Sequence, residues 1–411
     1  MKSRVLFLKN GLKLIFCQDN SKHMAIASLF VKFGGKYKKV EVDNNIHNIN
    51  RGMAHFIEHL LIEHSKVGNC LLEFKKKHTF ANGYTTKDHT EFIINSVVDF
   101  ENDLISLINM VNNPVFNRDD VEETKKAIIK EKMMAEDNKF DYLLRLDYSC
   151  LFNYIEYPNI LGEIEDINDI DYDKVKFCYD TFYQPSNQIL IISGKFNSKK
   201  IKKIVEDTYD SIKRNKVSFK IPLYKELNNV VKKEGFIKKD VHMDFVRVNY
   251  KINVSSFTPK ERLKLDFYMD YFLSYLFDAK SAVYNSLVEE KVCLYSINYF
   301  ISDDGDFWTI KIGTYTNSHD EFVNKITSAI SDKKVDIEDF NLRKKQALIG
   351  IILREDNLSN TITPFIDNVL RFGYDFMDTV EDIENHNFEE YKDFINKIDF
   401  SNYSITKMIR E

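Results

Sequence analysis

Cysteine is scarce in this chain of 411 residues, which contains only five. The five are widely scattered: Cys17, Cys70, Cys150, Cys178 and Cys293. Their number is odd and none belongs to a C-x-x-C pair, so neither a disulfide framework nor a thiolate metal site is expected. Dispersed free thiols suit a reducing compartment, and we therefore expect a cytoplasmic protein.

Long apolar runs and an excess of basic residues are also missing. The longest apolar run covers only 347–353, well short of the roughly 18 residues that indicate a membrane span. The first apolar stretch, 5–8, is too short for the core of a secretory leader. Lys and Arg number 58 against 63 Asp and Glu, a net charge of -5, so the chain lacks the positive charge that binds nucleic acid. We expect no membrane span and no nucleic-acid partner.

Glycine and proline are few as well, 13 and 6, which favours long helices joined by short turns. With 44% apolar residues, the chain is long enough to bury two or three cores. Runs of branched and aromatic residues between turn residues indicate strands. In the first half we expect strands over 12–17, 25–33, 90–97 and 188–193, and a helix over 118–135 capped by Asn117.

A polar, basic stretch over 213–226 is the best candidate for a linker between domains. It predicts domain limits of 1–215 and 216–411. The second half repeats the element order of the first, with expected strands over 241–254, 294–300, 307–315 and 403–409 and expected helices over 261–277, 321–331 and 337–353. This similarity indicates two related α+β domains.

The segment 52–61 reads GMAHFIEHLL and contains an H-x-x-E-H motif inside a helical pattern. His55 and His59 are four residues apart and project from one helix face, so both imidazoles can reach one zinc ion. Glu58 lies beside them, where its carboxylate can take a proton from a water molecule during attack on a carbonyl. With 10 histidines in the chain, the motif would arise by chance about 0.02 times, so a surface helix with two unrelated histidines is the poorer interpretation.

A catalytic zinc needs a third protein ligand and one open position. Glu131 is our candidate, because a neighbouring antiparallel helix over 118–135 could turn it toward the motif. Spacing alone leaves other carboxylates open: Glu63, Glu73, Glu91, Glu122 and Glu123. A metal sensor would need further ligands at metal-binding spacing. His64, His78 and His89 have no such spacing, and we expect them to be surface residues.

Along nearly its whole length, the sequence resembles the pitrilysin, insulysin and mitochondrial processing peptidase family of zinc metallopeptidases. The resemblance rests on several segments that follow in the same order. They are NGL at 10–12, GG at 34–35, GMAHFIEH at 52–59, NGYT at 82–85 with TEF at 90–92, the helix through Glu131, and FYQPSN at 182–187 with GKF at 194–196.

The resemblance implies two homologous α+β domains, each a mainly antiparallel sheet with helices packed on one face. It also implies a zinc endopeptidase acting on short peptides or unfolded segments, with Zn2+ bound by the two motif histidines and Glu131 and with Glu58 as general base. Asn82 and Gly83 would lie on an edge strand along which a peptide substrate is bound. Without the resemblance, these two residues indicate only an ordinary turn.

Three positions depart from the family pattern. Thr124 stands where a second glutamate often lies, seven residues before the third ligand, and Gly83 replaces an alanine. Active members carry an Arg and a Tyr seven residues apart in the second domain. Tyr295 matches the Tyr and would position the substrate carbonyl, but Val288 occupies the Arg position. Losing that cation would remove about 3 kcal/mol of transition-state stabilisation, roughly a hundredfold in rate, for which Lys291 is a nearby substitute.

Members of this size resemble half of the long single-chain enzymes and work as pairs. We therefore expect the catalytic subunit of a heterodimer in which a related chain supplies the Arg/Tyr pair, with a homodimer as the second choice. The rival interpretation is a non-catalytic scaffold or partner subunit, because some family members have lost the chemistry. Those members usually lack the zinc motif, which this chain keeps, so the sequence favours peptide hydrolysis.

Overall fold

The structure, a computed structural model, describes most of the chain. The described residues are 3–135, 138–213, 215–356, 362, 366, 368–371 and 380–411. They form two compact units. The first contains 3–135 and most of 158–223, and the second contains 138–157, 224–356 and 380–411. None of the helices formed by the described residues combines the length and the apolar composition that a membrane span requires.

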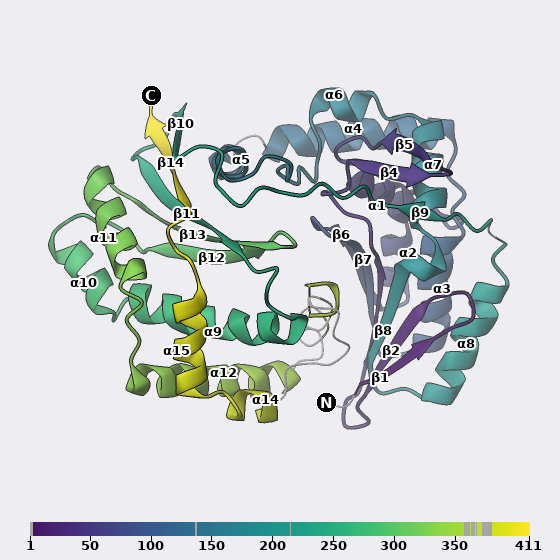
Figure 1. Ribbon diagram of the computed structural model, residues 1–411. Helices are drawn as coiled ribbons and strands as arrows, with labels where there is room; N and C mark the ends of the chain where they lie inside the picture. The colour runs from purple at the N-terminus through teal and green to yellow at the C-terminus, as the bar shows by residue number, and fades with distance from the viewer. Residues whose placement is uncertain are drawn as a thin grey trace. The chain divides into compact units, whose positions relative to one another are not determined.

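A six-stranded sheet forms the centre of the first unit, in the spatial order β1, β2, β8, β3, β7, β6 (Figure 1). Its strands are β1 (Arg4–Phe7), β2 (Lys13–Gln18), β3 (Ala25–Val31), β6 (Phe80–Thr85), β7 (Thr90–Ser96) and β8 (Gln188–Gly194). Only β2 and β8 run parallel, and every other neighbouring pair is antiparallel. β3 and β8 are buried along their whole length because they lie in the middle of the sheet. β6 forms an edge.

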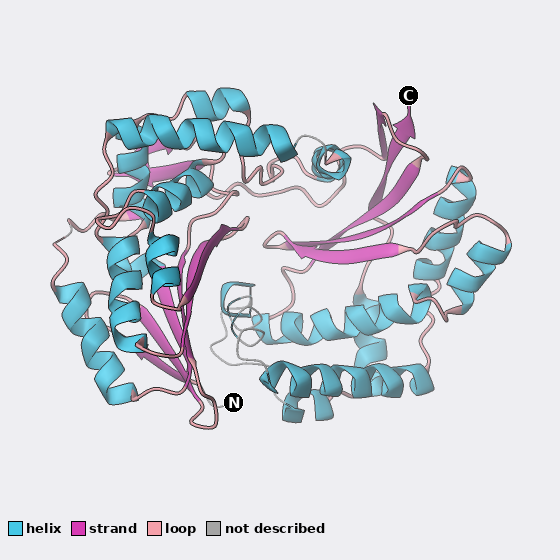
Figure 2. Cartoon of the chain, turned by 180° about the vertical axis from the view of Figure 1, so that it is seen from behind, coloured by secondary structure: helices cyan, strands magenta, loops and turns pink. Residues whose placement is uncertain are grey.

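The helices of the first unit gather on one side of this sheet (Figure 2). They are α1 (Met53–Glu63), α2 (Cys70–Lys76), α3 (Phe100–Asn112), α4 (Arg118–Ala135), α6 (Ile164–Asn168), α7 (Tyr172–Phe182), the short 3-10 helix η1 (Pro185–Asn187) and α8 (Ser198–Asp210). A small antiparallel sheet joins β4 (Lys39–Val42) to β5 (Asn45–Asn48) and β9 (Phe219–Lys220). α1 lies within this layer, packed against both β6 and α4.

The second unit is built on a five-stranded sheet in the order β10, β14, β11, β13, β12. Its strands are β10 (Glu234–Lys239), β11 (Phe245–Asn253), β12 (Asn298–Asp303), β13 (Phe307–Tyr315) and β14 (Tyr403–Arg410). Its helices within the described residues include α5 (Lys139–Leu151), α9 (Pro259–Phe277), α10 (Ala282–Glu289), α11 (His319–Ser331), α12 (Ile337–Asp356), α14 (Val380–Glu384) and α15 (Phe388–Lys397). Strands β10 and β14 are parallel, and the other pairs are antiparallel.

The two sheets share one topology. When their five common strands are numbered in chain order, starting from β2 and from β10, both sheets have the spatial order 1-5-2-4-3. In both, the single parallel pair joins the first strand to the last, which inserts beside the second strand. This repetition confirms the predicted fold of two related α+β domains with mainly antiparallel sheets.

Helix α5 follows the first unit in sequence but packs on the sheet of the second unit. Side chains alternate between the faces of a strand. On β11, Arg247 and Asn249 contact Asp147 of α5, whereas Val248 and Tyr250 join the apolar core with α9. This sheet therefore carries helices on both faces, with α5 on one face and α9 on the other, whereas we expected helices on one face only. The domain limits of 1–215 and 216–411 stay a prediction.

Most expected elements are present, with small shifts at their ends. The helix over 118–135 is α4, and Asn117 Oδ1 accepts the amide of Asp119 at 2.7 Å as an N-terminal cap. The strand expected over 294–300 begins only at Asn298. The preceding residues close the end of α10 instead, because the amides of Val292 and Cys293 both bond to Leu287 O at 2.9 Å.

Candidate metal centre

The H-x-x-E-H motif lies on α1, which begins directly after Gly52. Gly52 has a φ of 82°, and a Cβ there would lie 2.5 Å from Leu161 O, so only glycine fits. The helix is buried on nearly every side, because apolar residues occupy most of its surface. As a result His55 and Glu58 are only 8% and 5% exposed. The helix thus places polar groups of the motif in a largely dehydrated environment.

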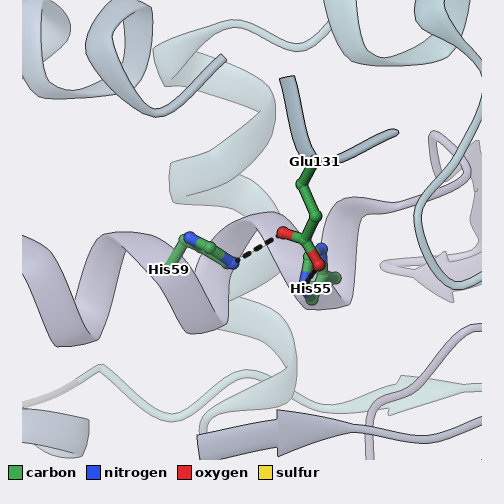
Figure 3. A group of neighbouring side chains, drawn as sticks. All are labelled: His55, His59 and Glu131. Carbon is green, nitrogen blue, oxygen red and sulfur yellow. Dashed lines mark ion pairs between the residues drawn. The ribbon is translucent and has the colours of Figure 1, made fainter. Parts of the chain in front are cut away.

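Glu131 reaches the motif from α4, which packs against α1. Figure 3 shows its carboxylate directed toward the two motif histidines. Its Oε2 lies 3.4 Å from His59 Nε2, and its Oε1 lies 3.8 Å from His55 Nε2. One ligand atom from each of the three residues lies within 4.8 Å of the others. The packing of the two helices therefore brings together the three residues that the sequence predicted as metal ligands.

Among the described residues, none of the other glutamates that we considered as a third ligand belongs to the group formed by His55, His59 and Glu131. Glu63 binds the far side of one motif histidine, with Oε1 3.2 Å from His59 Nδ1. Glu73 and Glu122 form surface ion pairs with lysines on their own helices. Glu91 is completely buried in β7, and Glu123 is exposed on α4.

Two imidazole nitrogens and one carboxylate are a donor set that suits zinc. Burial lowers the pKa of His55 to about 3, and the positive charge of His59 acts in the same direction. His55 is therefore a neutral imidazole, which is the form that binds a metal. Glu63 holds His59 through Nδ1 and leaves Nε2 facing Glu131, the kind of outer contact that orients metal-binding histidines. The residues present fit a zinc ion.

Glu58 points its carboxylate toward β6. Burial raises the pKa of Glu58 to about 7, although the hydrogen bond from Thr85 and the charge of His59 oppose the rise. Thr85 Oγ1 donates that hydrogen bond to Glu58 Oε2 at 2.6 Å. A carboxyl group with such a pKa can exist in both protonation states near neutral pH, as a general acid and base requires.

Asn82 and Gly83 lie on β6, where they pair with Ile93 and Phe92 of β7. Among the described strands none pairs with the other side of β6, so its backbone groups there are open to an added strand. Gly83 also borders the motif, because a Cβ at this position would lie 2.7 Å from Ile62 Cδ1 and 3.1 Å from Glu58 Oε1. Glycine in place of the family's alanine therefore leaves room for these two side chains.

Tyr295 belongs to the second unit. It is 59% exposed, and its ring contacts Tyr315 edge-on at 5.7 Å. Val288, the residue at the expected arginine position, is exposed on α10. The role of Tyr295 stays a prediction.

Thr85 and Glu63 are contacts of the motif that we did not assign from the sequence. Glu63 was weighed only as a metal ligand, although its spacing of four residues from His59 was a signal for the contact that it makes. Thr85 follows Glu58 by 27 residues, and only strand packing brings them together. Thr124, at the position of the family's second glutamate, is completely buried on α4.

The three further histidines that we expected at the surface, His64, His78 and His89, differ from one another. His78 is exposed, but the expectation is wrong for His89, which is buried and packs edge-on against Phe30. His64 is half-buried, 3.2 Å from Asp120 Oδ1 through its Nδ1. Exposed Glu123 lies near this pair. The helix packing of α1 and α4 thus creates a second group of polar side chains that spacing did not reveal.

Two family models match the chain. One, described as Insulinase (Peptidase family M16), covers residues 14–155, and the other, described as Peptidase M16 inactive domain, covers 169–348. In a comparison of whole sequences, the chain is 29% identical over 399 residues to YmfH of Bacillus subtilis, named as an uncharacterized zinc protease. That match covers 92% of this chain and 89% of YmfH.

Solved structures share the fold at low sequence identity. An M16-like peptidase from Alicyclobacillus acidocaldarius superposes with a TM-score of 0.88 and 20% identity, covering 100% of this chain and 98% of that one. The periplasmic protease PqqL of Escherichia coli superposes with a TM-score of 0.74 and 15% identity. The PqqL match covers 99% of this chain but only 47% of PqqL, so this fold corresponds to about half of that longer chain.

Proposed function

The chain belongs to peptidase family M16, the insulinase family, and we propose that it is a zinc-dependent endopeptidase that cleaves short peptides or unfolded segments. The observation that carries the proposal is the convergence of His55, His59 and Glu131 next to the buried carboxylate of Glu58. All four residues lie in the segment 14–155 that matches the Insulinase model.

In this proposal, the two motif histidines and Glu131 hold the zinc ion. When bound, zinc would polarise the scissile carbonyl and make a water molecule more acidic. Glu58 takes a proton from the attacking water and later gives it to the leaving amine. Its buried position, which favours the protonated form, suits the second of these transfers, and its hydrogen bond from Thr85 suits the first.

The open side of β6 is the proposed binding site for the peptide. An extended peptide adds to a sheet edge through main-chain hydrogen bonds, which require no particular side chains. Asn82 and Gly83 lie on this strand, and Gly83 is close to the general base, because a Cβ at this position would lie 3.1 Å from Glu58 Oε1. A peptide bound here is held near Glu58, so binding and hydrolysis use neighbouring parts of one unit.

A non-catalytic partner subunit is the second candidate. It is favoured by the match of 169–348 to a model described as an inactive domain. That segment contains neither the motif on α1 nor Glu131 on α4, however. The support for a non-catalytic subunit therefore comes only from the part of the chain that lacks the metal centre, and the endopeptidase remains the better proposal.

We also propose that the active enzyme contains two subunits, the second of which supplies an arginine and a tyrosine. Val288 removes the cation expected in this chain's own second unit. The match to only 47% of PqqL supports pairing, because one copy of this fold accounts for half of that protein. A heterodimer is the first choice and a homodimer the second.

A cytoplasmic location belongs to the same proposal. All five cysteines are buried free thiols, which a reducing compartment preserves.

The test is cleavage of a mixed peptide library by the purified, zinc-loaded chain, read by mass spectrometry. The matched control is Glu58→Gln, which removes the proton acceptor but keeps the size of the side chain. Cleavage by the native chain that disappears in the variant would support a self-sufficient zinc endopeptidase and would make a partner's arginine unnecessary. One bound zinc per chain without cleavage would favour a subunit that depends on its partner.

A further inference from the structure

Thr85 contacts the proposed general base directly. Its hydroxyl donates a hydrogen bond of 2.6 Å to Glu58 Oε2, and neither group is fully exposed. We propose that Thr85 is a positioning residue, which fixes the Glu58 carboxylate in the orientation needed for proton transfer. This inference rests on the proposed function, because it assigns Thr85 a role through the general base of that reaction.

Strand β6 constrains the carboxylate of Glu58 from two positions. Gly83 and Thr85 are two residues apart and therefore point to the same face of the strand. A Cβ on Gly83 would approach Glu58 Oε1 to 3.1 Å, whereas the hydroxyl of Thr85 binds Oε2. One carboxylate oxygen thus lies against bare backbone and the other accepts a hydrogen bond, which together restrict rotation of the carboxylate.

Thr85 is itself supported by the paired residue on the next strand. Thr85 and Thr90 are direct partners in the register of β6 and β7, with their hydroxyl oxygens 3.3 Å apart. Thr90 donates its proton to Phe33 O at 2.9 Å, so it can offer Thr85 only an acceptor. Thr85 has one proton and two acceptors, and the much shorter distance assigns that proton to Glu58.

A hydrogen bond to a buried charged group contributes more than one between neutral groups. Removing it should leave the carboxylate free to rotate away from the attacking water. The loss should affect the chemical step rather than zinc binding, because Thr85 is not one of the proposed zinc ligands. Peptide binding should also be unaffected, because the substitution leaves the main-chain groups at the edge of β6 unchanged. This pattern distinguishes positioning from a merely structural role of Thr85 in the hairpin.

The test compares Thr85→Val, which has the same shape without the hydroxyl, with Thr85→Ser, which keeps the hydroxyl. For a fluorogenic peptide cleaved by the native chain, Thr85→Val should lower kcat about 10- to 100-fold with KM changed less than about threefold. Thr85→Ser should restore most of kcat. Zinc content and the thermal midpoint should equal those of the native chain. In the Glu58→Gln background, adding Thr85→Val should leave peptide affinity, measured by fluorescence anisotropy, unchanged.

Several results would overturn the inference. A kcat of Thr85→Val within twofold of native, no recovery in Thr85→Ser, or weaker peptide binding in the double variant would each show that Thr85 does not act through Glu58. If the zinc-loaded native chain cleaves no peptide in the library, either alone or together with a related subunit that supplies the arginine, the proposed function fails and the inference fails with it. Cleavage that depends on Glu58 but not on Thr85 would refute the inference alone.

Discussion

Side chains of the same type on α4 have different interactions, depending on the side of the helix on which they lie. Glu122 and Glu131 are both glutamates on this helix, but Glu122 forms a surface ion pair with Lys125, whereas Glu131 faces two histidines. The difference follows from the 3.6-residue period of the helix, which directs them to different sides. Residue type alone therefore says little about which carboxylate completes a metal site.

Glu131→Gln should weaken zinc binding at least about 100-fold, because it removes a charged ligand from the proposed site. Glu122→Gln is the control and should bind zinc as the native chain does. Competition with a chromophoric chelator measures both affinities. Equal zinc affinity for the two variants would exclude Glu131 as a ligand.

At the scale of secondary-structure elements, α5 is held on the second sheet by a buried polar network. Asp147 accepts hydrogen bonds from Arg247 at 2.5 Å, Asn249 at 3.1 Å and Thr406 at 2.6 Å. These partners lie on β11 and β14, so one carboxylate joins the helix to two strands. A completely buried carboxylate such as that of Asp147 stabilises the folded state only while its oppositely charged partner is present.

Asp147→Ala should therefore destabilise the second unit by about 3–5 kcal/mol, because it leaves the guanidinium of Arg247 buried without its counter-ion. Trp308 is the only tryptophan in the chain and is completely buried in β13, so its fluorescence during urea unfolding reports on this unit. Glu290→Gln removes an exposed ion pair with Lys325 and serves as the control, for which we expect little change. Similar unfolding midpoints for the two variants would contradict a stabilising role of the network.

A second buried ion pair lies near residue 224, where the chain returns to the second unit. Glu226 accepts hydrogen bonds from Tyr154 N at 2.7 Å and from Lys251 Nζ at 3.0 Å. Burial alone would raise the pKa of Glu226, but hydrogen bonds from the backbone amides of Asn153 and Tyr154 and from Lys251 outweigh it and lower the pKa to about 2.

The sign of the pH dependence follows from this lowered pKa. The unfolded chain takes up the proton near pH 4.5 and the folded chain only near pH 2, so the stabilisation is complete above pH 4.5 and is lost between pH 4.5 and 2. Glu226→Gln should be less stable than the native chain at pH 7, and the difference should shrink as the pH falls through this interval. Urea unfolding followed by Trp308 fluorescence measures it, and a difference independent of pH would disprove the assignment.

At the scale of the whole molecule, two copies of one sheet topology are joined by a chain that crosses between the units more than once. Residues 138–157 leave the first unit, contribute α5 to the second, and return. The second unit therefore depends on a segment that precedes the predicted domain limit at 215/216. Without it, Arg247 on β11 would lose its buried counter-ion Asp147, and Asn249 and Lys251 would each lose one of their buried hydrogen-bond partners.

A fragment of residues 216–411 should accordingly fail to reach the native fluorescence of Trp308. Adding a peptide that covers 138–157 should restore it, whereas a peptide with Asp147→Ala should restore much less. Fluorescence titration measures both. A fragment that folds fully by itself would support the domain limits that we predicted from the sequence and would show that α5 is dispensable.

Features that depend on local spacing could be predicted from the sequence. The period of α1 places His55, Glu58 and His59 together, and the runs of branched residues predicted β3, β7, β8 and most strands of the second unit. The order of motifs was sufficient to predict the family and the doubled α+β fold, which the shared topology of the two sheets confirms.

Contacts between segments far apart in the sequence could be recognised only in the folded chain. Glu131 could not be separated from its competitors by spacing, because the choice depends on how α4 packs on α1. Thr85 reaches Glu58 only through the register of β6. From the sequence, the face of β11 that carries Arg247 and Lys251 resembles a face exposed to solvent, but in the structure α5 covers it. The periodicity of a helix or strand determines on which face a side chain lies. Which other segment packs on that face depends on long-range packing, which no local periodicity encodes.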